Sequence, residues 1–198
     1  MSPFYVDDTA FDGSERQISQ LLKLLMKRGP DWGHFPEPNK FLFILDTPGQ
    51  EESARLEFAA EGLTLNFGSV SRYLGAYIGL QEELEAWVKP QVEAWVHGVR
   101  VLGKIAQQHH QSDYTGVGMS LQIKWQYLQR TVPGVGTLVG PTEEALREKL
   151  FPALFGVEEI NADFRKILGR SFKHGGLGIL DPRLSAEIAY NISKAVSG

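Results

Sequence analysis

The most informative absence in this sequence is cysteine, of which the 198 residues contain none. Disulfide bonds and thiolate metal sites are therefore excluded, which fits a reducing compartment. Long apolar runs are also missing, since no stretch approaches the roughly 20 consecutive apolar residues that a membrane span needs. The start of the chain lacks the basic and then apolar order of a secretory signal. We therefore expect an intracellular protein, nuclear or cytoplasmic, with no membrane partner.

An excess of positive charge is missing as well. The chain has 20 lysines and arginines against 24 aspartates and glutamates, a net charge of −4, which argues against a protein that coats nucleic acid through bulk electrostatics. The charge is uneven: residues 1–62 hold six basic and eleven acidic side chains (net −5), and residues 165–183 hold five basic and one acidic (net +4). An acidic site followed by a basic arm suits metal chemistry beside a phosphate backbone, and a solvated face is the alternative.

Hydrophobic periodicity divides the chain into a mixed first part and a helical remainder. Up to Gly79 short apolar runs alternate with helical spacing, and after it apolar residues recur every three or four positions. We therefore predict an α+β fold with three regions, residues 1–79, 80–164 and 165–198. The expected strands cover residues 4–6, 9–11, 41–45, 63–67 and 72–78. The expected helices cover residues 14–29, 51–60, 84–102, 113–130 and the segments after 141 and 181.

Local signals fix several of these ends. Ser14 and Gln17 form a capping box, and Asp113 is predicted to cap a helix. A glycine-rich turn at residues 174–178 precedes the last helix, which begins at Asp181-Pro182. Along that helix, apolar side chains recur every four residues: Leu184, Ile188, Ile192 and Val196.

Two adjacent aspartates stand out near the start of the chain. Residues 4–6 are typical of a strand and residues 9–11 of its returning partner, which predicts Asp7 and Asp8 at the tip of a β-hairpin. Neighbouring carboxylates repel one another unless a cation neutralises them, and hard oxygen ligands favour Mg²⁺ or Mn²⁺. Phosphoryl transfer with two metals is the natural chemistry, and it usually needs a third carboxylate on a neighbouring strand. Turn formation alone is the alternative, because aspartate is favoured in turns.

The residues around and after these aspartates resemble a known family. Phe4-Tyr5-Val6-Asp7-Asp8 resembles the F/Y-x-D-D motif of reverse transcriptases. This motif is followed, in the order found in the family, by a helix, a loop over residues 33–40 that ends in a lysine, and a hydrophobic strand. Tyr73-Leu74-Gly75 then resembles the L-G turn of the primer grip. Three later segments are similar to parts of retrotransposon-type enzymes that follow the palm: residues 125–133, 151–156 and 174–182.

The resemblance implies an RNA-directed DNA polymerase of the non-LTR retrotransposon type. Residues 1–79 would be the C-terminal part of the palm, residues 80–164 a helical thumb-like region, and residues 165–198 a basic helical arm. The implied cofactor is Mg²⁺ or Mn²⁺. The implied partners are an RNA template, a DNA primer and a deoxynucleoside triphosphate.

The resemblance also implies residue roles. Asp7 would be a principal ligand of the catalytic metals, and Asp8 an adjacent ligand or its electrostatic support. Tyr5 would lie near the primer end, and Lys40 near the triphosphate, where a lysine can protonate the leaving pyrophosphate. Leu74 and Gly75 would hold the primer backbone, because glycine lets phosphates approach closely. A solvated loop lysine and an ordinary turn glycine are the alternatives for Lys40 and Gly75.

The sequence departs from the family pattern in two ways. Glu37 stands where the family usually has asparagine, with Asn39 two residues later. The strand with the first metal-binding aspartate and the fingers of the enzyme also have no counterpart from Met1 onward. We therefore expect a polymerase fragment that is inactive alone.

A second hypothesis is a non-catalytic nucleic-acid-binding or scaffold protein derived from a retrotransposon. In either case the basic arm supplies the residues expected to contact phosphates, Arg165, Lys166 and Arg170. An inert relic is the third hypothesis.

Overall fold

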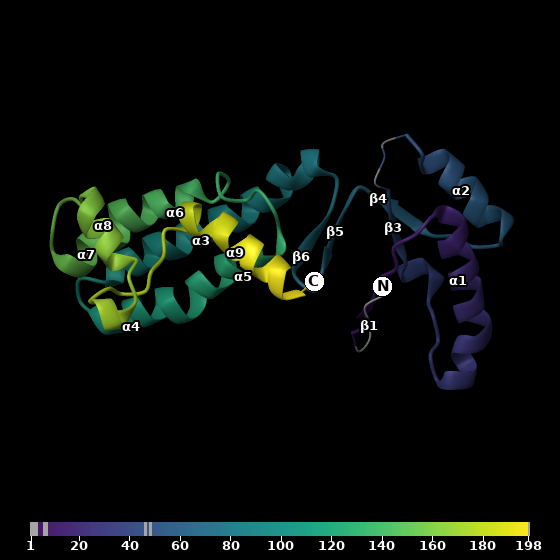
Figure 1. Ribbon diagram of the computed structural model, residues 1–198, viewed down its shortest axis with the longest axis horizontal. Coiled ribbons are helices and arrows are strands. Elements are labelled where there is room, and N and C mark those ends of the chain that lie inside the picture. The colour runs from purple at the N-terminus through teal and green to yellow at the C-terminus, as the bar shows by residue number, and fades with distance from the viewer. Residues whose placement is uncertain (1–3, 6–7, 46, 48, 198) are drawn as a thin grey trace. The chain divides into compact units, whose positions relative to one another are not determined.

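The computed structural model describes residues 4–5, 8–45, 47 and 49–197 (Figure 1). The chain separates into two compact units. Unit 1 comprises Met1–Ser71 and Ile78–Gln81, and unit 2 comprises Arg72–Tyr77 and Glu82–Gly198. The predicted α+β class is confirmed in its coarse form, because the described residues form many helices and three two-stranded pairs.

Unit 1 mixes strands and helices, as the periodicity predicted. Its described elements, in chain order, are β1 (Phe4–Tyr5), β2 (Asp8–Thr9), α1 (Glu15–Arg28), the 3₁₀ turns η1 (Gly29–Trp32) and η2 (Pro38–Lys40), β3 (Leu42–Ile44), α2 (Glu51–Ala60) and β4 (Asn66–Gly68).

Helix α1 begins where its capping box predicts. The backbone amide of Gln17 donates to the Ser14 hydroxyl oxygen at 3.4 Å, and the Ser14 amide donates to the Gln17 side-chain oxygen at 2.9 Å. Two of the amides that a helix start leaves unpaired are thereby satisfied. The helix gives way at Gly29 to a 3₁₀ turn that contains Pro30, so its predicted end is confirmed as well.

The centre of unit 1 is a parallel strand pair joined through a helix. Strands β3 and β4 pair with Leu42 opposite Asn66 and Ile44 opposite Gly68, and α2 forms the crossover between them. Three phenylalanine rings meet edge to face beneath this crossover, with centroids 4.9 to 6.1 Å apart: Phe43, Phe58 and Phe67. Their burial, together with Leu22 of α1, supplies the apolar contacts that hold the crossover in place.

The segment predicted as one strand over residues 72–78 is instead a hairpin. Strand β5 (Val70–Tyr73) pairs with β6 (Ala76–Gly79), and only Leu74 and Gly75 separate them. Both have positive φ, 49° and 87°, the backbone of a tight two-residue turn. The alternation of side chains predicted the extended backbone correctly and missed the reversal at Leu74 and Gly75.

Unit 2 is helical beyond the hairpin tip, as expected for the second half of the chain. After η3 (Gln81–Glu83), whose first residue belongs to unit 1, its described elements are α3 (Leu84–Ile105), α4 (His110–Gly116), η4 (Val117–Leu121), α5 (Gln122–Thr131), α6 (Gly140–Ala145), η5 (Leu146–Leu150), α7 (Phe151–Phe155), α8 (Ala162–Leu168), η6 (Phe172–His174) and α9 (Pro182–Ser197).

Two of these elements, η4 and η5, are single π-helical turns that join neighbouring α-helices. Because η4 connects α4 to α5, the helix predicted over residues 113–130 extends from His110 to Thr131. Asp113 was predicted to cap this helix, and that prediction is wrong. The helix has already begun three residues earlier, and Asp113 is a buried residue inside α4.

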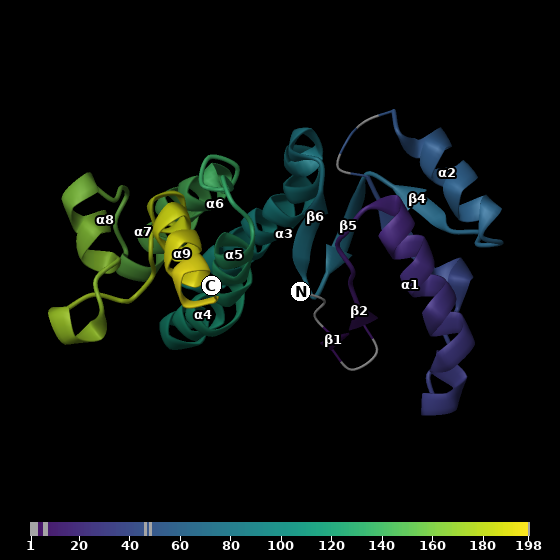
Figure 2. The ribbon, with the colours of Figure 1, turned by 45° about the vertical axis from the view of Figure 1, so that its right-hand side comes forward.

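The core of unit 2 is built on α3. Apolar residues at helical spacing in α3 pack against α6 and the π-helical turns η4 and η5. Trp95 and Trp125 meet in this core with ring centroids 6.4 Å apart. Helix α9 lies along α5, as Figures 1 and 2 both show. Among the described residues, no helix is both long and apolar enough to cross a bilayer.

Candidate functional site

A hairpin forms at the start of unit 1, and its returning strand begins at Asp8, one residue earlier than predicted. Strands β1 and β2 are antiparallel, with Phe4 opposite Thr9 and Tyr5 opposite Asp8. Asp8 was predicted in the turn and belongs instead to the returning strand. The pairing nevertheless brings the backbones of two predicted site residues, Tyr5 and Asp8, opposite one another.

The proposed metal ligands are only partly described. Asp7 lies outside the described residues, and the side chains of Tyr5 and Asp8 do so too. Within the described part of the chain, no group of three or more histidines, cysteines, aspartates and glutamates could hold a metal ion. The Mg²⁺ or Mn²⁺ site at Asp7 and Asp8 therefore stays a prediction. Two neighbouring carboxylates have the hard oxygen donors that these ions prefer.

Lys40 lies at the end of the exposed turn η2. Its ammonium group pairs with the Glu37 carboxylate at 2.9 Å, and both side chains are largely exposed. Glu37 thus supplies a local partner for Lys40. The turn is fixed by Asn66 of β4, whose side-chain amide donates to the Asn39 carbonyl at 2.6 Å. An exposed pair of this kind is worth about 0 to 1 kcal/mol, so Lys40 is able to exchange it for another anion.

The Leu74-Gly75 turn is held against α5 by one tyrosine. The Tyr127 hydroxyl donates a hydrogen bond to the Leu74 carbonyl. The Tyr127 ring lies so close to Gly75 that a Cβ there would approach Cε1 to 3.0 Å. Gly75 is thus required both by its positive φ and by the ring beside it. Leu74 is the one described residue other than glycine with a positive φ, a costly backbone for a branched side chain.

Sequence reasoning did not assign a role to Tyr127. The residue belongs to the family-like segment 125–133, but its spacing gives no hint that it bonds to a turn more than fifty positions earlier. The available signal was a tyrosine at the edge of an apolar helix face, because an aromatic ring that packs on one side often directs its hydroxyl to a polar partner.

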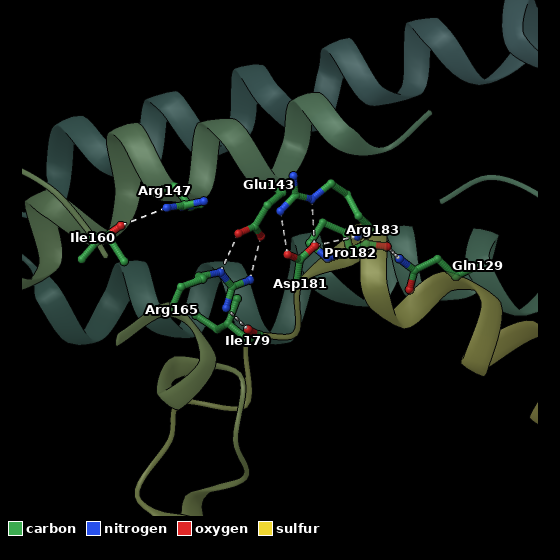
Figure 3. Close-up of polar contacts among 9 residues, drawn as sticks. All are labelled: Gln129, Glu143, Arg147, Ile160, Arg165, Ile179, Asp181, Pro182 and Arg183. Carbon is green, nitrogen blue, oxygen red and sulfur yellow. Dashed lines mark hydrogen bonds and ion pairs between the residues drawn. The ribbon is translucent and has the colours of Figure 1, made fainter. Parts of the chain in front are cut away.

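The structure removes Arg165 from the predicted phosphate-binding set. Its guanidinium group forms a two-pronged ion pair with Glu143 of α6, with Nε and one terminal nitrogen each 2.7 Å from a carboxylate oxygen. The other terminal nitrogen donates to the Ile179 carbonyl at 2.9 Å. Arg165 is 6% exposed and Glu143 is fully buried. Since all three guanidinium nitrogens have buried partners, this side chain cannot reach a phosphate without leaving the core (Figure 3).

A second ion pair lies beside the first. Asp181, just before α9, accepts hydrogen bonds from the Arg183 backbone amide at 2.9 Å and from two nitrogens of its guanidinium group at 2.9 and 3.2 Å. Gln129 of α5 donates from its fully buried side chain to the Pro182 carbonyl at 2.6 Å. Both sets of contacts are drawn in Figure 3: the Gln129 bond joins the start of α9 to α5, and the Asp181–Arg183 pair closes within that start.

The two carboxylates of this cluster are shifted in opposite directions. Burial raises the pKa of Glu143, and the hydrogen bonds and charge of Arg165 act against that rise. Burial alone would also raise the pKa of Asp181, but the hydrogen bonds and charge of Arg183 outweigh it and lower the pKa below its ordinary value. Asp181 therefore stabilises the fold in its charged form.

The remaining basic residues of the arm are exposed. Lys166 pairs at its surface with Asp163 at 3.1 Å. Neither Arg170 nor Lys173 forms an ion pair with another described residue. The Arg170 backbone is fixed, because its carbonyl accepts from the Gly178 amide at 2.8 Å and lies where a Cβ on Gly176 would clash at 2.0 Å. The predicted glycine-rich turn thus fixes the backbone from which the exposed Arg170 side chain projects.

Comparison with known proteins does not identify a family: the chain matches no family profile, no curated protein and no solved structure.

The buried ion pair gives a first prediction. We expect Arg165→Ala to lower the free energy of unfolding of unit 2 by about 3 to 5 kcal/mol, because it leaves Glu143 charged and buried without a partner. Lys166→Ala, the neighbouring residue with an exposed ion pair, should change it by less than about 1 kcal/mol. Urea unfolding followed by tryptophan fluorescence measures both. Equal effects of the two substitutions would contradict the assignment.

Asp181 gives a prediction for pH. Because its pKa in the folded protein lies below that in the unfolded chain, its contribution is complete above roughly pH 4, the ordinary range of aspartate, and is lost as the pH falls through the folded value. The stability difference between the native protein and Asp181→Asn should therefore shrink as the pH is lowered below about 4. Urea unfolding of both proteins at several pH values measures this difference. A constant difference across the acid range would show that Asp181 is not stabilised in its charged form.

Proposed function

We propose that the chain forms the C-terminal part of a reverse transcriptase palm followed by a thumb-like helical region that contacts template and primer. The observation that carries this proposal is the meeting, within unit 2, of the segments that resemble the family. Tyr127, in segment 125–133, bonds to Leu74 of the primer-grip-like turn. Gln129, in the same segment, bonds to Pro182 at the end of segment 174–182.

The remaining family-like segment joins the same assembly. Phe151 begins segment 151–156 and is fully buried, and the Arg165 guanidinium carbon lies 5.0 Å from the centre of its ring. Arg165 also bonds to Ile179 in segment 174–182. Segments that are far apart in the sequence are thus joined by direct contacts. Direct contacts of this kind are expected between segments that belong to one structural pattern, which supports assigning these segments to the same family pattern.

The chemistry would be nucleotidyl transfer. Asp7 and Asp8 would bind Mg²⁺ at the primer end, and a primer 3′-hydroxyl would attack the α-phosphate of a deoxynucleoside triphosphate in line with the departing pyrophosphate. Lys40 would break its ion pair with Glu37 and then protonate the departing pyrophosphate. Such a centre needs a further carboxylate on a neighbouring strand, for which the sequence after β2 offers no identified counterpart. We therefore expect residues 1–198 by themselves to bind template and primer without extending the primer.

Iron-directed cleavage tests the metal site directly. Fe²⁺ can replace Mg²⁺ at oxygen sites, where it reduces added hydrogen peroxide to a hydroxyl radical that cuts nucleic acid nearby, and ascorbate reduces the resulting Fe³⁺ back to Fe²⁺. With residues 1–198 and a duplex of RNA template and DNA primer, we expect cuts clustered at the primer 3′ end. The Asp7→Asn and Asp8→Asn double variant should lose them, because the neutral amides no longer attract the cation.

The matched control removes another adjacent pair of acids, with Glu51→Gln and Glu52→Gln at the start of α2, and should leave the cuts unchanged. Cleavage that survives the loss of Asp7 and Asp8, or that spreads evenly along the duplex, contradicts the proposed metal site. Primer extension by residues 1–198 alone would contradict the need for a further carboxylate.

The second candidate is a non-catalytic nucleic-acid-binding protein, and the exposed cations of the C-terminal segment favour it. Lys166, Arg170 and Lys173 are all exposed, and two of them have no ion-pair partner among the described residues. Arg165 is not part of this surface. A binding role would use these cations on phosphates and would not need the acidic hairpin.

The two candidates differ in which substitutions weaken binding. If the cations contact phosphates, changing Lys166, Arg170 and Lys173 to alanine should weaken duplex binding and reduce the slope of log affinity against log salt by up to about 0.9 per lost contact. A control that removes the same charge from α3, Lys89→Ala, Arg100→Ala and Lys104→Ala, should have a smaller effect. Fluorescence anisotropy over a salt series measures both. If both triple variants lose the same duplex affinity, the basic segment contributes only its net charge to binding.

A further inference from the structure

An exposed aromatic ring lies in the basic segment between α8 and α9. Phe172 in η6 is 66% exposed, and its ring meets Tyr114 of α4, beside which this segment lies in Figure 1. The ring centroids are 6.0 Å apart and the ring planes stand at 89°. An edge-to-face contact of this kind covers at most one face of the Phe172 ring. The opposite face is therefore open to solvent.

The surroundings of this ring are fixed by the fold of unit 2. Tyr114 is half-buried, and its hydroxyl donates to the Leu177 carbonyl at 2.7 Å. The glycine-rich turn closes tightly on the other side of Phe172, because a Cβ on Gly176 would lie 2.0 Å from the Arg170 carbonyl oxygen. A segment that already has its shape loses less conformational entropy when a partner binds. The open face of Phe172 is thus a prearranged contact surface.

Unpaired positive charge stands on both sides of the ring. Arg170 precedes Phe172 by two residues and Lys173 follows it directly. Both cations are exposed, and neither forms an ion pair with another described residue. Residues 164–180 contain no acid. Two steps between Cα atoms span at most about 7.6 Å, so the two cations and the ring can contact one short ligand together.

We propose that Phe172 is a stacking platform for one base of a single-stranded nucleic acid, with Arg170 and Lys173 on the neighbouring phosphates. A single exposed apolar residue indicates little by itself. An open aromatic face beside unpaired cations is the combination with which proteins bind single strands without sequence preference. A duplex cannot use the ring, because its bases are already stacked and paired inside the helix. The inference rests on the nucleic-acid-binding role proposed for the C-terminal segment and names the form of nucleic acid.

The first experiment removes the ring. Residues 1–198 are titrated against a labelled single strand of about ten thymidines, a usual length for such sites, and binding is followed by fluorescence anisotropy. Phe172→Ala should weaken the affinity by about 5-fold to 150-fold, the effect of losing one stacked base. Phe35→Ala is the matched control, since Phe35 is 72% exposed in unit 1, and it should leave the affinity unchanged. Equal affinities of the two variants overturn the platform.

A salt series separates the ring from the cations. Arg170→Ala with Lys173→Ala should reduce the slope of log affinity against log salt by up to about 1.4, since each phosphate contact on a single strand contributes about 0.7. Phe172→Ala should weaken binding at every salt concentration without changing the slope, because stacking releases no counterions. A slope that falls in Phe172→Ala would show that the ring acts only by supporting the cations, and stacking would be overturned.

Changes in the ligand test stacking from the other side. A strand with abasic sites keeps its phosphates and lacks bases, so Phe172→Ala should not alter the affinity for it or for a blunt duplex. On the thymidine strand, Phe172→Trp should retain the affinity, whereas Phe172→Leu should lose it, because leucine is apolar without a π face. Circular dichroism checks that each variant is folded. Native affinity in Phe172→Leu, or weaker abasic binding in Phe172→Ala, contradicts stacking.

The outcomes distinguish this inference from the binding role on which it rests. If changing Arg170 and Lys173 weakens binding and Phe172→Ala does not, the phosphate interface stands and the platform is overturned. If residues 1–198 bind duplex but no single strand, the platform is again overturned and the binding role stands. If they bind neither, both fail, and an acidic protein surface becomes the candidate partner of these cations. None of these measurements depends on Asp7 or Asp8.

Discussion

The buried ion pair between Glu143 and Arg165 is the constraint on which the C-terminal part of the structure depends. Two opposite charges are removed from water here, and they are tolerated because each guanidinium nitrogen has a hydrogen-bond acceptor. The pair joins α8 to α6, and its third bond fixes the backbone at Ile179. That backbone leads directly into Asp181 and the start of α9. The buried pair thus fixes the segment that leads into α9, and the packing of α9 along α5 sets its course from there.

The same pair changes the meaning of the positive charge in residues 165–183. Counted along the sequence, this segment has a surplus of basic residues suited to phosphate binding. In the folded chain Arg165 neutralises Glu143 in the core, and Arg183 and Lys166 pair with Asp181 and Asp163. The charge that remains for a partner is concentrated at Arg170 and Lys173. A nucleic-acid interface in this region would therefore be smaller than the sequence suggests.

The primer-grip-like turn shows how a short motif gains meaning from its surroundings. Leu74 and Gly75 adopt a strained reversal, and the Tyr127 ring and hydroxyl hold it in place. Backbone strain of this kind persists only where neighbouring structure enforces it, and it is concentrated at functional sites. The turn is thus a rigid feature fixed to a helix, which suits an element that must hold a nucleic-acid backbone. Its role in a polymerase stays a proposal.

The sequence by itself determined the mixed first part and helical second part, the start and end of α1, the antiparallel strand pair near the start of the chain without its register, and the glycine-rich turn. These features depend on local chemistry such as helix caps, side-chain spacing and turn residues, which lie within a few residues of one another in the sequence. Tertiary structure decided the rest. Whether Arg165 contacts solvent or Glu143, and whether the apolar side chains spaced every four residues along α9 are covered, depends on residues far away in the chain. Helical spacing shows that side chains share a face, and only packing decides whether anything covers that face.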